Sequence, residues 1–303
     1  MAERRRKLTI GLPVFNGERY LEQSIVSLLE QTFDDFELII SDNASTDATP
    51  EIVASLQSTD SRIVSVRHPK NRGAIWNFNT TFRMSGSPYF KWTAADDFHA
   101  PTYLERCIEV LERNPDLVWA HTVSRHVDQH GSVLSPESRF RISYPLRQSP
   151  RAVERFESVL LGGSCLDSYG VIRASALRRT PMLVPLFGSE KLLFAELALI
   201  GGYGEVHEEL FFSRLHDSMA GVLNSCESQH QFTAASGRTP KFIRLRLLAG
   251  YLSVIGRSGL STRDRLHAYR KVAKYVFQIQ KWKRVLLGDL TGKGTGGNVR
   301  IAT

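Results

Sequence analysis

Short apolar runs alternate with helical patterns along the first half of this chain of 303 residues. Apolar residues at every third or fourth position indicate helices, and runs rich in β-branched and aromatic residues indicate strands. The expected strands are residues 8–14, 36–41, 63–66 and 89–93, and the helices between them are residues 19–31, 49–56 and 74–83. This alternation predicts an α/β fold with a doubly wound, mostly parallel sheet, whose ligands bind at the carboxyl ends of the strands.

The second half continues the alternation and ends in helices. We expect helices at residues 101–113, 152–161 and 190–200, and strands at residues 117–123 and 169–172. Two long helical patterns, residues 241–256 and 263–287, precede a glycine-rich tail at 291–303 that is expected to be disordered. The sequence therefore predicts one main domain at residues 1–237 and a C-terminal helical extension at residues 238–303.

The net charge of +8 is distributed unevenly along the chain. Residues 1–237 carry 24 Lys and Arg against 29 Asp and Glu, whereas residues 238–303 carry 15 against 2. A nucleic-acid-binding protein usually shows its basic surface on the folded domain itself, so this distribution argues against nucleic acid as the partner. A basic C-terminal part facing an anionic membrane surface, or an acidic partner, fits the asymmetry better.

The cysteines and the apolar runs indicate a cytoplasmic protein. Cys107, Cys165 and Cys226 are widely spaced and form no Cys-x-x-Cys pattern, which argues against a disulfide framework and a zinc site. Residues 8–14 are too short and too proline-interrupted for a signal sequence, and no apolar run reaches 18 residues. We therefore expect neither secretion nor a membrane-spanning helix.

Three polar loops follow the predicted strands and should converge on one crevice. They are residues 13–16, 42–45 and 95–97, and none has the glycine pattern of a dinucleotide or P-loop site. Adjacent aspartates such as Asp96 and Asp97 are often ordinary turn residues. Here they follow a strongly apolar run and lie beside two other suitable loops. Carboxylates would repel a bare diphosphate, so a diphosphate ligand would need Mg²⁺ or Mn²⁺ between them.

Three segments together resemble family 2 glycosyltransferases. They are IGLPVFNGERYL at residues 10–21, ELIISDNASTD at 37–47 and WTAADD at 92–97, and the similarity covers roughly residues 7–220. The resemblance implies a GT-A fold, with donor binding in about residues 7–125 and the acceptor side in about 126–237. It also implies inverting transfer of a sugar from a UDP-, GDP- or dTDP-linked donor to an acceptor hydroxyl, in bacterial cell-surface or secondary glycan biosynthesis.

By this resemblance the first loops bind the donor nucleotide. Pro13 and Phe15 would flank the nucleobase, with Phe15 standing where a tyrosine is often found. Asp42 would accept a hydrogen bond from the base, and Arg72 would approach the nucleotide. Structural roles remain open: Phe15 as a core residue, Asp42 as a turn cap and Arg72 as a solvated side chain.

The aspartate pair is expected to make the remaining donor contacts. By the resemblance Asp96 would contact the ribose or the sugar, and Asp97 would bind the Mn²⁺ or Mg²⁺ ion. Many relatives carry a further aspartate two residues before the pair, where this chain has Ala94. By the resemblance, this departure affects the hydrogen bonds to the donor and leaves the metal ligand in place.

An inverting transfer also needs a base that removes a proton from the acceptor hydroxyl. Family members place an acidic residue at the start of a late helix, and Glu190 fits that description. Alternatively, Ser189 caps this helix and Glu190 only complements the helix dipole. Glu196 is a second candidate for the base, expected on the exposed side of the helix.

Arg214 and His216 lie two residues apart and would point to the same side of an extended segment. In relatives, a histidine or arginine here approaches the metal or the diphosphate. We therefore expect His216 at the metal and Arg214 at the diphosphate, where they would stabilise the charge on the leaving group. A structural role for His216 is the alternative.

The last helical pattern, residues 263–287, is amphipathic and basic. It sets Leu266 and Val272 against Arg270 and Lys274, with Trp282 near its end. Such a helix either lies on an anionic bilayer or packs on the domain with a solvated basic face. The first alternative would make the protein peripheral on the inner face of the membrane and would suit a glycan or lipid-linked acceptor.

Two other functions remain open. A sugar-nucleotide nucleotidyltransferase shares the general α/β design, but it is expected to carry a glycine-rich phosphate loop after the first strand, which residues 11–17 lack. A non-catalytic scaffold that binds nucleotide or glycan is the other alternative. Binding of a nucleoside diphosphate without sugar turnover would identify it.

Overall fold

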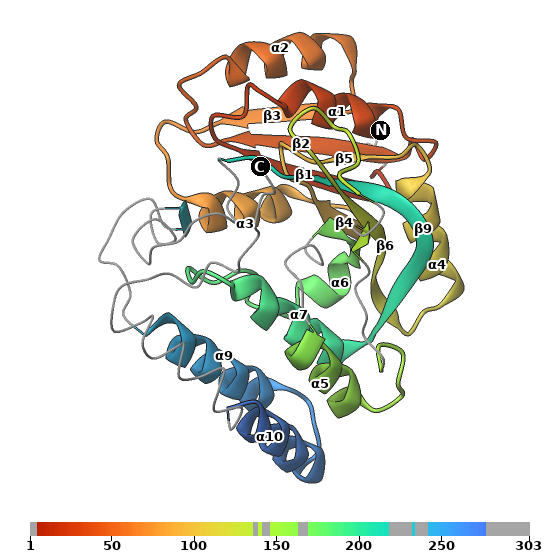
Figure 1. Ribbon diagram of the computed structural model, residues 1–303, viewed down its shortest axis with the longest axis vertical. Helices are drawn as coiled ribbons and strands as arrows, with labels where there is room; N and C mark the ends of the chain where they lie inside the picture. The colour runs from red at the N-terminus through yellow and green to blue at the C-terminus, as the bar shows by residue number, and fades with distance from the viewer. Residues whose placement is uncertain are drawn as a thin grey trace.

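The computed structural model describes residues 5–135, 139–140, 146–162, 169–217, 232–233 and 242–276. Strands and helices alternate along the chain, as the sequence predicts (Figure 1). The strands are β1 (Leu8–Val14), β2 (Phe36–Asp42), β3 (Ile63–Arg67), β4 (Tyr89–Trp92), β5 (Phe98–His99), β6 (Leu117–Val127), β7 (Arg139–Phe140), β8 (Val171–Arg173) and β9 (Gly202–Arg214). The helices are α1 (Leu21–Leu29), α2 (Thr49–Thr59), α3 (Ala74–Met84), α4 (Tyr103–Arg113), α5 (Ala152–Gly162), α6 (Ala174–Leu177), α7 (Ser189–Ile200), α9 (Ile243–Arg257) and α10 (Thr262–Val276).

The strands form one mixed, mostly parallel sheet, which confirms the predicted fold class. Their order is β3-β2-β1-β4-β8-β6-β9-β5, with β7 paired to β6. β1 is parallel to β2 and β4, β2 is parallel to β3, and β6 is parallel to β9. β8 is antiparallel to both β4 and β6. The carboxyl ends of β1, β2, β3, β4, β6 and β9 therefore meet at one edge of the sheet.

Helices cover both faces of the sheet, and each face has its own apolar core. One core joins the strands to α1, α2 and α4. The other joins them to α3 and α7, with α5, α9 and α10 packed behind α7. Figure 1 shows α1 and α2 at one end of the molecule and the group α5, α7, α9 and α10 at the other. The loops at the carboxyl edge of the sheet and the C-terminal helices thus belong to one folded body.

The sequence of β1 explains how it fits at the centre of the sheet. A Cβ atom on Gly11 would lie 2.3 Å from Oγ1 of Thr81 on α3, so only glycine permits this close packing. β4 pairs with β1 only as far as Gly11 opposite Trp92. Pro13, which cannot donate a backbone hydrogen bond, pairs with Ser41 of β2 but stands beyond the end of β4, so it removes no hydrogen bond from the β1–β4 ladder.

β9 is a 13-residue strand that the sequence pattern does not predict as a whole. It pairs with β6 along its length, but the register shifts between Thr122 and Val123 and again between Val123 and Ser124. Each such irregularity changes which face a side chain points to, and so it breaks the period-two alternation that identifies a strand. The same irregular pairing carries β6 to Val127, four residues beyond its predicted end.

The C-terminal helices pack on the main domain. Tyr251, Val254 and Ile255 of α9, and Ala268 and Val272 of α10, belong to the same core as Trp92 and Trp119. α9 confirms the helix expected at residues 241–256. The described part of the last helix is α10, so residues 277–287 with Trp282 and the tail at 291–303 lie outside the described residues.

Candidate active site

Five loops meet at the carboxyl edge of the sheet. They follow β1, β2, β3, β4 and β9. These loops and the strand ends before them carry eight of the nine predicted site residues: Pro13, Phe15, Asp42, Arg72, Asp96, Asp97, Arg214 and His216. Glu190 stands on a separate element, in the first turn of α7. This edge is where an open α/β sheet binds its ligands.

Backbone hydrogen bonds lock the loops after β1 and β2 together. The Asn16 backbone N–H donates to Ser45 Oγ at 2.9 Å, and the Thr46 N–H donates to Asn16 Oδ1 at 2.9 Å. The Gly17 N–H donates to Thr49 Oγ1 at 2.9 Å. Asn16 and Ala44 adopt positive φ angles of 53° and 65°, which are strained for residues other than glycine. The two loops therefore form one preorganised rim.

Phe15 and Asp42 differ in how exposed they are at this rim. The Phe15 side chain is 47% exposed, so its ring is available for stacking and is not a core residue. Asp42 is 4% exposed, and its Oδ1 accepts the Ser45 backbone N–H at 2.9 Å. Its Oδ2 lies 3.3 Å from Arg67 Nε. Asp42 thus has the expected turn-capping bond and keeps a second oxygen beside a cation.

Asn43 holds the loop that carries Arg72. The Arg72 backbone N–H donates to Asn43 Oδ1 at 3.0 Å, and Asn43 Nδ2 donates to Asn71 Oδ1 at 2.9 Å. The Arg72 guanidinium is exposed and lies 4.2 Å from the centre of the Trp76 ring. The His68 ring packs edge-on against Trp76 at 4.6 Å. Arg72 is therefore held over the Trp76 ring, beside the loop after β2.

The sequence reading did not single out Asn43, His68 or Trp76. Asn43 stands in the string of turn-forming residues 42–47. Trp76 lies in the first turn of α3, and Arg72 precedes this helix, so helical spacing does not predict their contact. His68 follows β3, whose loop was not included among the expected site loops. Burial lowers the pKa of His68, although the negative charge of Asp42 acts to raise it.

The two adjacent carboxylates have different environments. Asp97 is 4% exposed, and its Oδ1 accepts the Arg214 backbone N–H at 2.9 Å. Burial raises the pKa of Asp97 well above its usual value, and the negative charge of Asp96 adds to this effect. The Asp96 side chain is 29% exposed, and its Oδ2 lies 2.8 Å from His216 Nε2. The pair therefore presents one buried oxygen ligand and one partly solvated carboxylate with an imidazole.

Arg214 is engaged with the protein on every side. Its Nε donates to the Asp96 carbonyl at 2.9 Å, Nη2 donates to Gln23 Oε1 at 2.6 Å, and Nη1 donates to the Gln129 carbonyl at 3.1 Å. The side chain is 2% exposed and stacks 4.5 Å from the centre of the Tyr20 ring. A diphosphate contact would have to displace one of these bonds. In this structure the guanidinium instead ties the loop after β4 to α1 and to the turn after β6.

Lys91 is a buried cation that the sequence reading also missed. It lies on β4 with 0% exposure, its Nζ donates to the Tyr169 carbonyl, and the ammonium stands 4.7 Å from the centre of the Tyr103 ring. Burial lowers the pKa of Lys91 to about 7, partly opposed by Cys107 and Asp97. A buried lysine beside a buried carboxylate makes the charge of each depend on the other.

The oxygen and nitrogen ligands available at this edge of the sheet suit a hard divalent cation. Asp97 offers a buried carboxylate, and Asp96 and His216 stand together beside it. Mg²⁺ and Mn²⁺ commonly bind through one or two carboxylates and complete their shell with substrate phosphates and water. Among the described residues, no group of three or more His, Cys, Asp or Glu side chains is arranged to hold a metal by itself.

The start of α7 differs from the expectation in two respects. Gly188, with φ of 83°, precedes the helix, and Ser189 is buried with no capping hydrogen bond, so Ser189 is not the cap. Glu190 is half-buried in the first turn. Glu196, expected on the exposed side, is 7% exposed, and Arg257 donates to both of its carboxylate oxygens at 2.7 Å. That expectation was wrong because α9 covers this side of α7.

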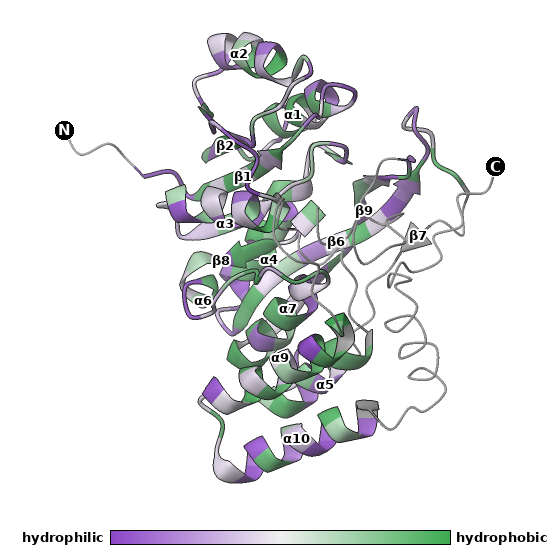
Figure 2. Ribbon diagram, turned by 90° about the vertical axis from the view of Figure 1, so that its left-hand side faces the viewer, coloured by the Kyte–Doolittle hydropathy of each residue, from purple (hydrophilic) through white to green (hydrophobic). Residues whose placement is uncertain are grey.

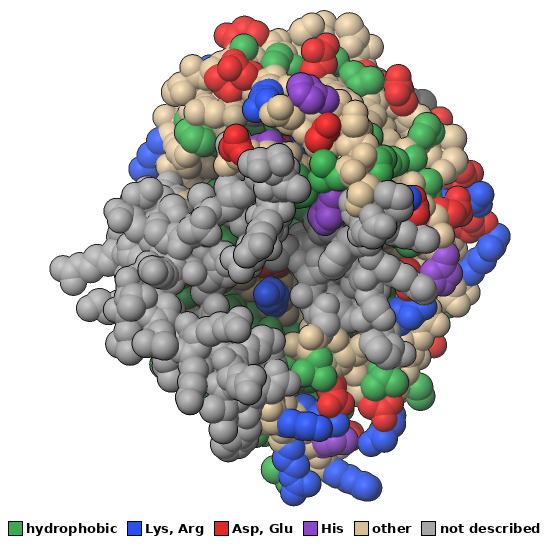
Figure 3. Space-filling model, viewed as in Figure 1, with side chains coloured by type: hydrophobic (Ala, Val, Ile, Leu, Met, Phe, Trp, Pro, Cys, Tyr) green, Lys and Arg blue, Asp and Glu red, His purple; other side chains and the backbone are tan. Residues whose placement is uncertain are grey.

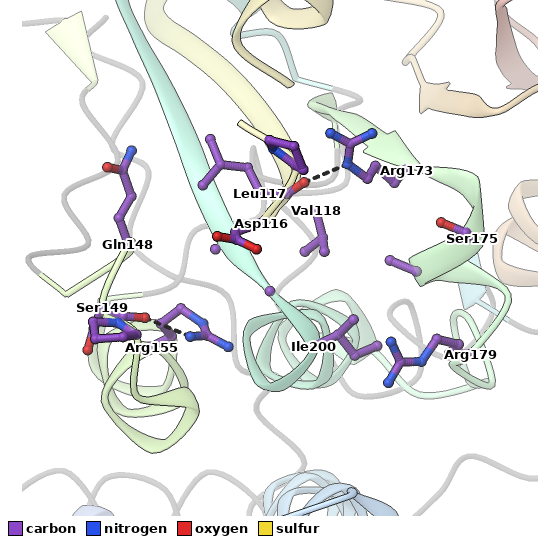
Figure 4. Close-up of a pocket in the computed structure, with 15 residues that line it drawn as sticks. Asp116, Leu117, Val118, Gln148, Ser149, Arg155, Arg173, Ser175, Arg179 and Ile200 are labelled. Atoms are coloured by element: carbon purple, nitrogen blue, oxygen red, sulfur yellow. Dashed lines mark hydrogen bonds between the residues drawn. The ribbon is translucent and has the colours of Figure 1, made fainter. Parts of the chain in front are cut away.

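A hollow of about 640 Å³ opens at the opposite edge of the sheet, where β6 and β9 begin. Figure 4 shows Arg173 bonded to the Leu117 carbonyl and Arg155 bonded to the Ser149 carbonyl at its walls. These bonds join secondary-structure elements, and none of the predicted site residues lines the hollow. It is therefore separate from the candidate active site.

The glycosyl transferase family 2 model matches residues 9–165 of this chain. An uncharacterized glycosyltransferase of Haemophilus influenzae is 31% identical over 246 residues, which cover 80% of this chain and 73% of that protein. The chain therefore belongs to glycosyl transferase family 2. A chondroitin synthase of Escherichia coli is 29% identical over 128 residues, which are 42% of this chain and 18% of that much longer relative.

Solved structures show the same fold. Staphylococcus aureus TarS 1-349 in complex with UDP-GlcNAc matches with a TM-score of 0.64 and 14% identity, over 89% of this chain and 71% of that one. Mannosyltransferase PcManGT from Pyrobaculum calidifontis, in complex with GDP-Man and Mn²⁺, matches with a TM-score of 0.57 and 15% identity, over 95% and 86%. The GT-A fold expected from the sequence is thus confirmed.

Proposed function

We propose that this chain is a metal-dependent, inverting glycosyltransferase that moves a sugar from a nucleotide-diphosphate donor to an acceptor hydroxyl. The observation that carries the proposal is the carboxylate pair at the loop edge of the sheet. Asp97 is buried beside Asp96, and burial together with the charge of Asp96 raises the pKa of Asp97 well above its usual value, although Lys91 and Arg214 act in the opposite direction. A divalent cation carrying a diphosphate would stabilise the charged form of both carboxylates.

Pro13, Phe15, Asp42 and Arg72 would bind the donor nucleotide. The exposed Phe15 ring and the Arg72 guanidinium on Trp76 offer flat surfaces, and the rim that carries them is held by hydrogen bonds. Oδ2 of Asp42 could accept a hydrogen bond from the nucleobase, but the Arg67 side chain beside it would have to move aside. The complexes of TarS with UDP-GlcNAc and of PcManGT with GDP-Man support a nucleotide-sugar donor.

Asp97 and His216 would hold the cation, and Asp96 would contact the ribose or the sugar. The cation, Mn²⁺ or Mg²⁺, would supply positive charge to the departing diphosphate; the Mn²⁺ of the PcManGT complex supports this choice. His216 and Asp96 orient each other through their 2.8 Å contact. We assign Arg214 a positioning role, because its nitrogens hold the loop of the aspartate pair. Any direct contact with the diphosphate would follow a rearrangement of these bonds.

Glu190 would act as the base that removes the proton of the acceptor hydroxyl. It stands on α7, outside the donor loops, as an acceptor-side base must for attack on the face opposite the leaving group. Glu196 is excluded from this role by its ion pair with Arg257. A glycan or a lipid-linked glycan is the proposed acceptor class, in cell-surface or secondary glycan synthesis. A lipid-linked acceptor would require the enzyme to reach the membrane from the cytoplasm.

The test is a panel of UDP-, GDP- and dTDP-sugars, assayed for donor binding, hydrolysis and transfer with and without a chelator. We expect the chelator and Asp97→Ala to weaken donor binding. Glu190→Gln should keep donor binding and abolish transfer. Glu51→Gln is the matched control, because Glu51 is an exposed acid in the first turn of α2.

The possible outcomes separate the alternatives. Transfer by Glu190→Gln at the wild-type rate would refute the assignment of the base. Cation-dependent binding of a nucleoside diphosphate without turnover of any sugar would identify a binding scaffold. Formation of a nucleotide-sugar from a nucleoside triphosphate and a sugar phosphate would identify a nucleotidyltransferase.

A further inference from the structure

α9 and α10 form a helix pair with one face on the domain and one face outward. Residues 258–261 join the two helices, which pack against each other, and α9 contacts α7 while α10 contacts α5. Their inward residues are buried: Tyr251, Val254 and Ile255 on α9, and Ala268 and Val272 on α10. Figure 1 shows the pair at the end of the molecule farthest from α2. The outward side is therefore free of the rest of the described chain.

Large apolar side chains recur on this outward side. On α9 and the residue before it, Phe242, Leu245 and Leu252 are 44%, 42% and 42% exposed. Leu245 and Leu252 are seven residues apart and therefore lie on one side of α9, and Phe242 directly precedes the helix. On α10, Leu266 is 52% exposed. Single exposed leucines are common, but a row of them along a helix and its neighbour marks an interaction surface.

Basic side chains accompany this apolar row. Between residues 243 and 276 the chain carries eight Lys and Arg and one acidic residue, Asp264. Asp264 is engaged locally, since its Oδ2 accepts from Ser261 Oγ at 2.8 Å. Two of the cations are paired inward, Arg257 with Glu196 and Lys271 with Glu157, each at 2.7 Å. Four others are exposed: Arg246, Arg263, Arg270 and Lys274.

Figures 2 and 3 show where hydropathy and charge lie at this end of the molecule. Figure 2 shows hydrophilic and hydrophobic positions alternating along α10. Figure 3 shows Lys and Arg side chains gathered at the end of the molecule where α10 lies. We define the basic-apolar face as Phe242, Leu245, Arg246, Leu252, Arg263, Leu266, Arg270 and Lys274.

We propose that the basic-apolar face docks on an anionic lipid bilayer. Each Lys or Arg near such a surface contributes on the order of 1 kcal/mol, and apolar side chains between them enter the headgroup region. An acidic protein or a nucleic acid would use the charges but would leave the apolar row exposed. Charge and apolar area together fit a membrane surface.

The inner side of α9 links this face to the proposed base. A Cβ atom on Gly250 would lie 2.5 Å from Cδ1 of Leu192 on α7, so the two helix backbones are in close contact. Arg257 of α9 donates to both oxygens of Glu196 on α7. α7 begins with the turn that carries Glu190. If the proposed function holds, membrane docking therefore fixes the height of Glu190 above the bilayer, as a lipid-linked acceptor requires.

The experiment measures binding of the full chain to vesicles, with no sugar turnover in the readout. Vesicles of phosphatidylcholine alone and of phosphatidylcholine with phosphatidylglycerol are sedimented with the protein at low and high salt. The basic variant is Arg270→Glu with Lys274→Glu, and the apolar variant is Leu252→Ser with Leu266→Ser. The matched control is Arg83→Glu with Arg113→Glu, which makes the same charge change at exposed positions of α3 and α4.

We expect binding to the phosphatidylglycerol vesicles only, weakened by salt. The basic variant should reduce the partition coefficient by about tenfold or more, the apolar variant should also reduce it, and the control should not. The proposal would be overturned if the control and the basic variant bound equally well to the phosphatidylglycerol vesicles. It would also be overturned if the wild type did not bind these vesicles at low salt. Full binding by the apolar variant would also overturn it, because charge alone would then suffice. A wild-type dimer that the apolar variant dissociates would assign the face to a second copy instead.

Discussion

Replacing Asp97 by asparagine should make the cation-free protein more stable, although it removes the proposed metal ligand. Burial and the neighbouring charge of Asp96 raise the pKa of Asp97 well above its usual value. At pH values between the pKa of Asp97 in the unfolded state and its pKa in the folded state, the native state keeps Asp97 protonated and the unfolded state does not. The contribution of Asp97 to the free energy of unfolding therefore falls as the pH rises through this range.

The size of the effect follows from proton linkage. The contribution falls by up to about 1.4 kcal/mol for each pH unit between the unfolded and the folded pKa. Asp97→Asn removes this dependence and keeps the side-chain oxygen that accepts the Arg214 backbone N–H. We therefore expect the free energy of unfolding of the variant to rise relative to that of the wild type as the pH increases from 5 to 8.

Urea denaturation with a chelator at pH 5, 6, 7 and 8 measures this difference. Asp34→Asn is the control, because Asp34 is exposed and should show no such trend. Adding Mn²⁺ with a nucleoside diphosphate should stabilise the wild type and leave Asp97→Asn nearly unchanged, since ligand binding stabilises only a competent native state. A chelated variant that is less stable than the wild type at every pH would refute the reasoning about the buried charge.

Two further substitutions test how the site is held. Arg214→Gln removes the hydrogen bonds that Arg214 donates to three buried or partly buried oxygens, and it should lower the free energy of unfolding by roughly 3 kcal/mol. The variant should also lose Mn²⁺-dependent binding of the nucleotide-sugar. Unchanged binding would argue against the positioning role of Arg214. Arg257→Met leaves the buried Glu196 carboxylate without its partner and should cost about 2 kcal/mol in urea denaturation, discounted because Arg257 is 39% exposed. Arg113→Met, at an exposed arginine of α4, should change the stability by much less.

Local patterns were enough to predict the alternation of elements and the sheet. The runs at residues 8–14 and 36–41 became β1 and β2 almost residue for residue, because a buried parallel strand needs a continuous apolar run. β9 escaped prediction because its irregular pairing with β6 breaks the alternation of side chains. The loops that follow the early strands were found for a general reason: ligands of an open sheet lie at the carboxyl ends.

The sequence by itself determined that this chain forms an α/β sheet with polar loops at one edge and a basic helical C-terminus. Tertiary structure alone decided which charged groups face a ligand and which hold the protein together. Arg214 meets Gln23 and Asp96 through contacts across 191 and 118 positions, and Arg257 meets Glu196 across 61. Local spacing carries no information about such partners. Burial and pairing, which set the pKa of Asp97 and engage Arg214, arise only when distant segments pack together.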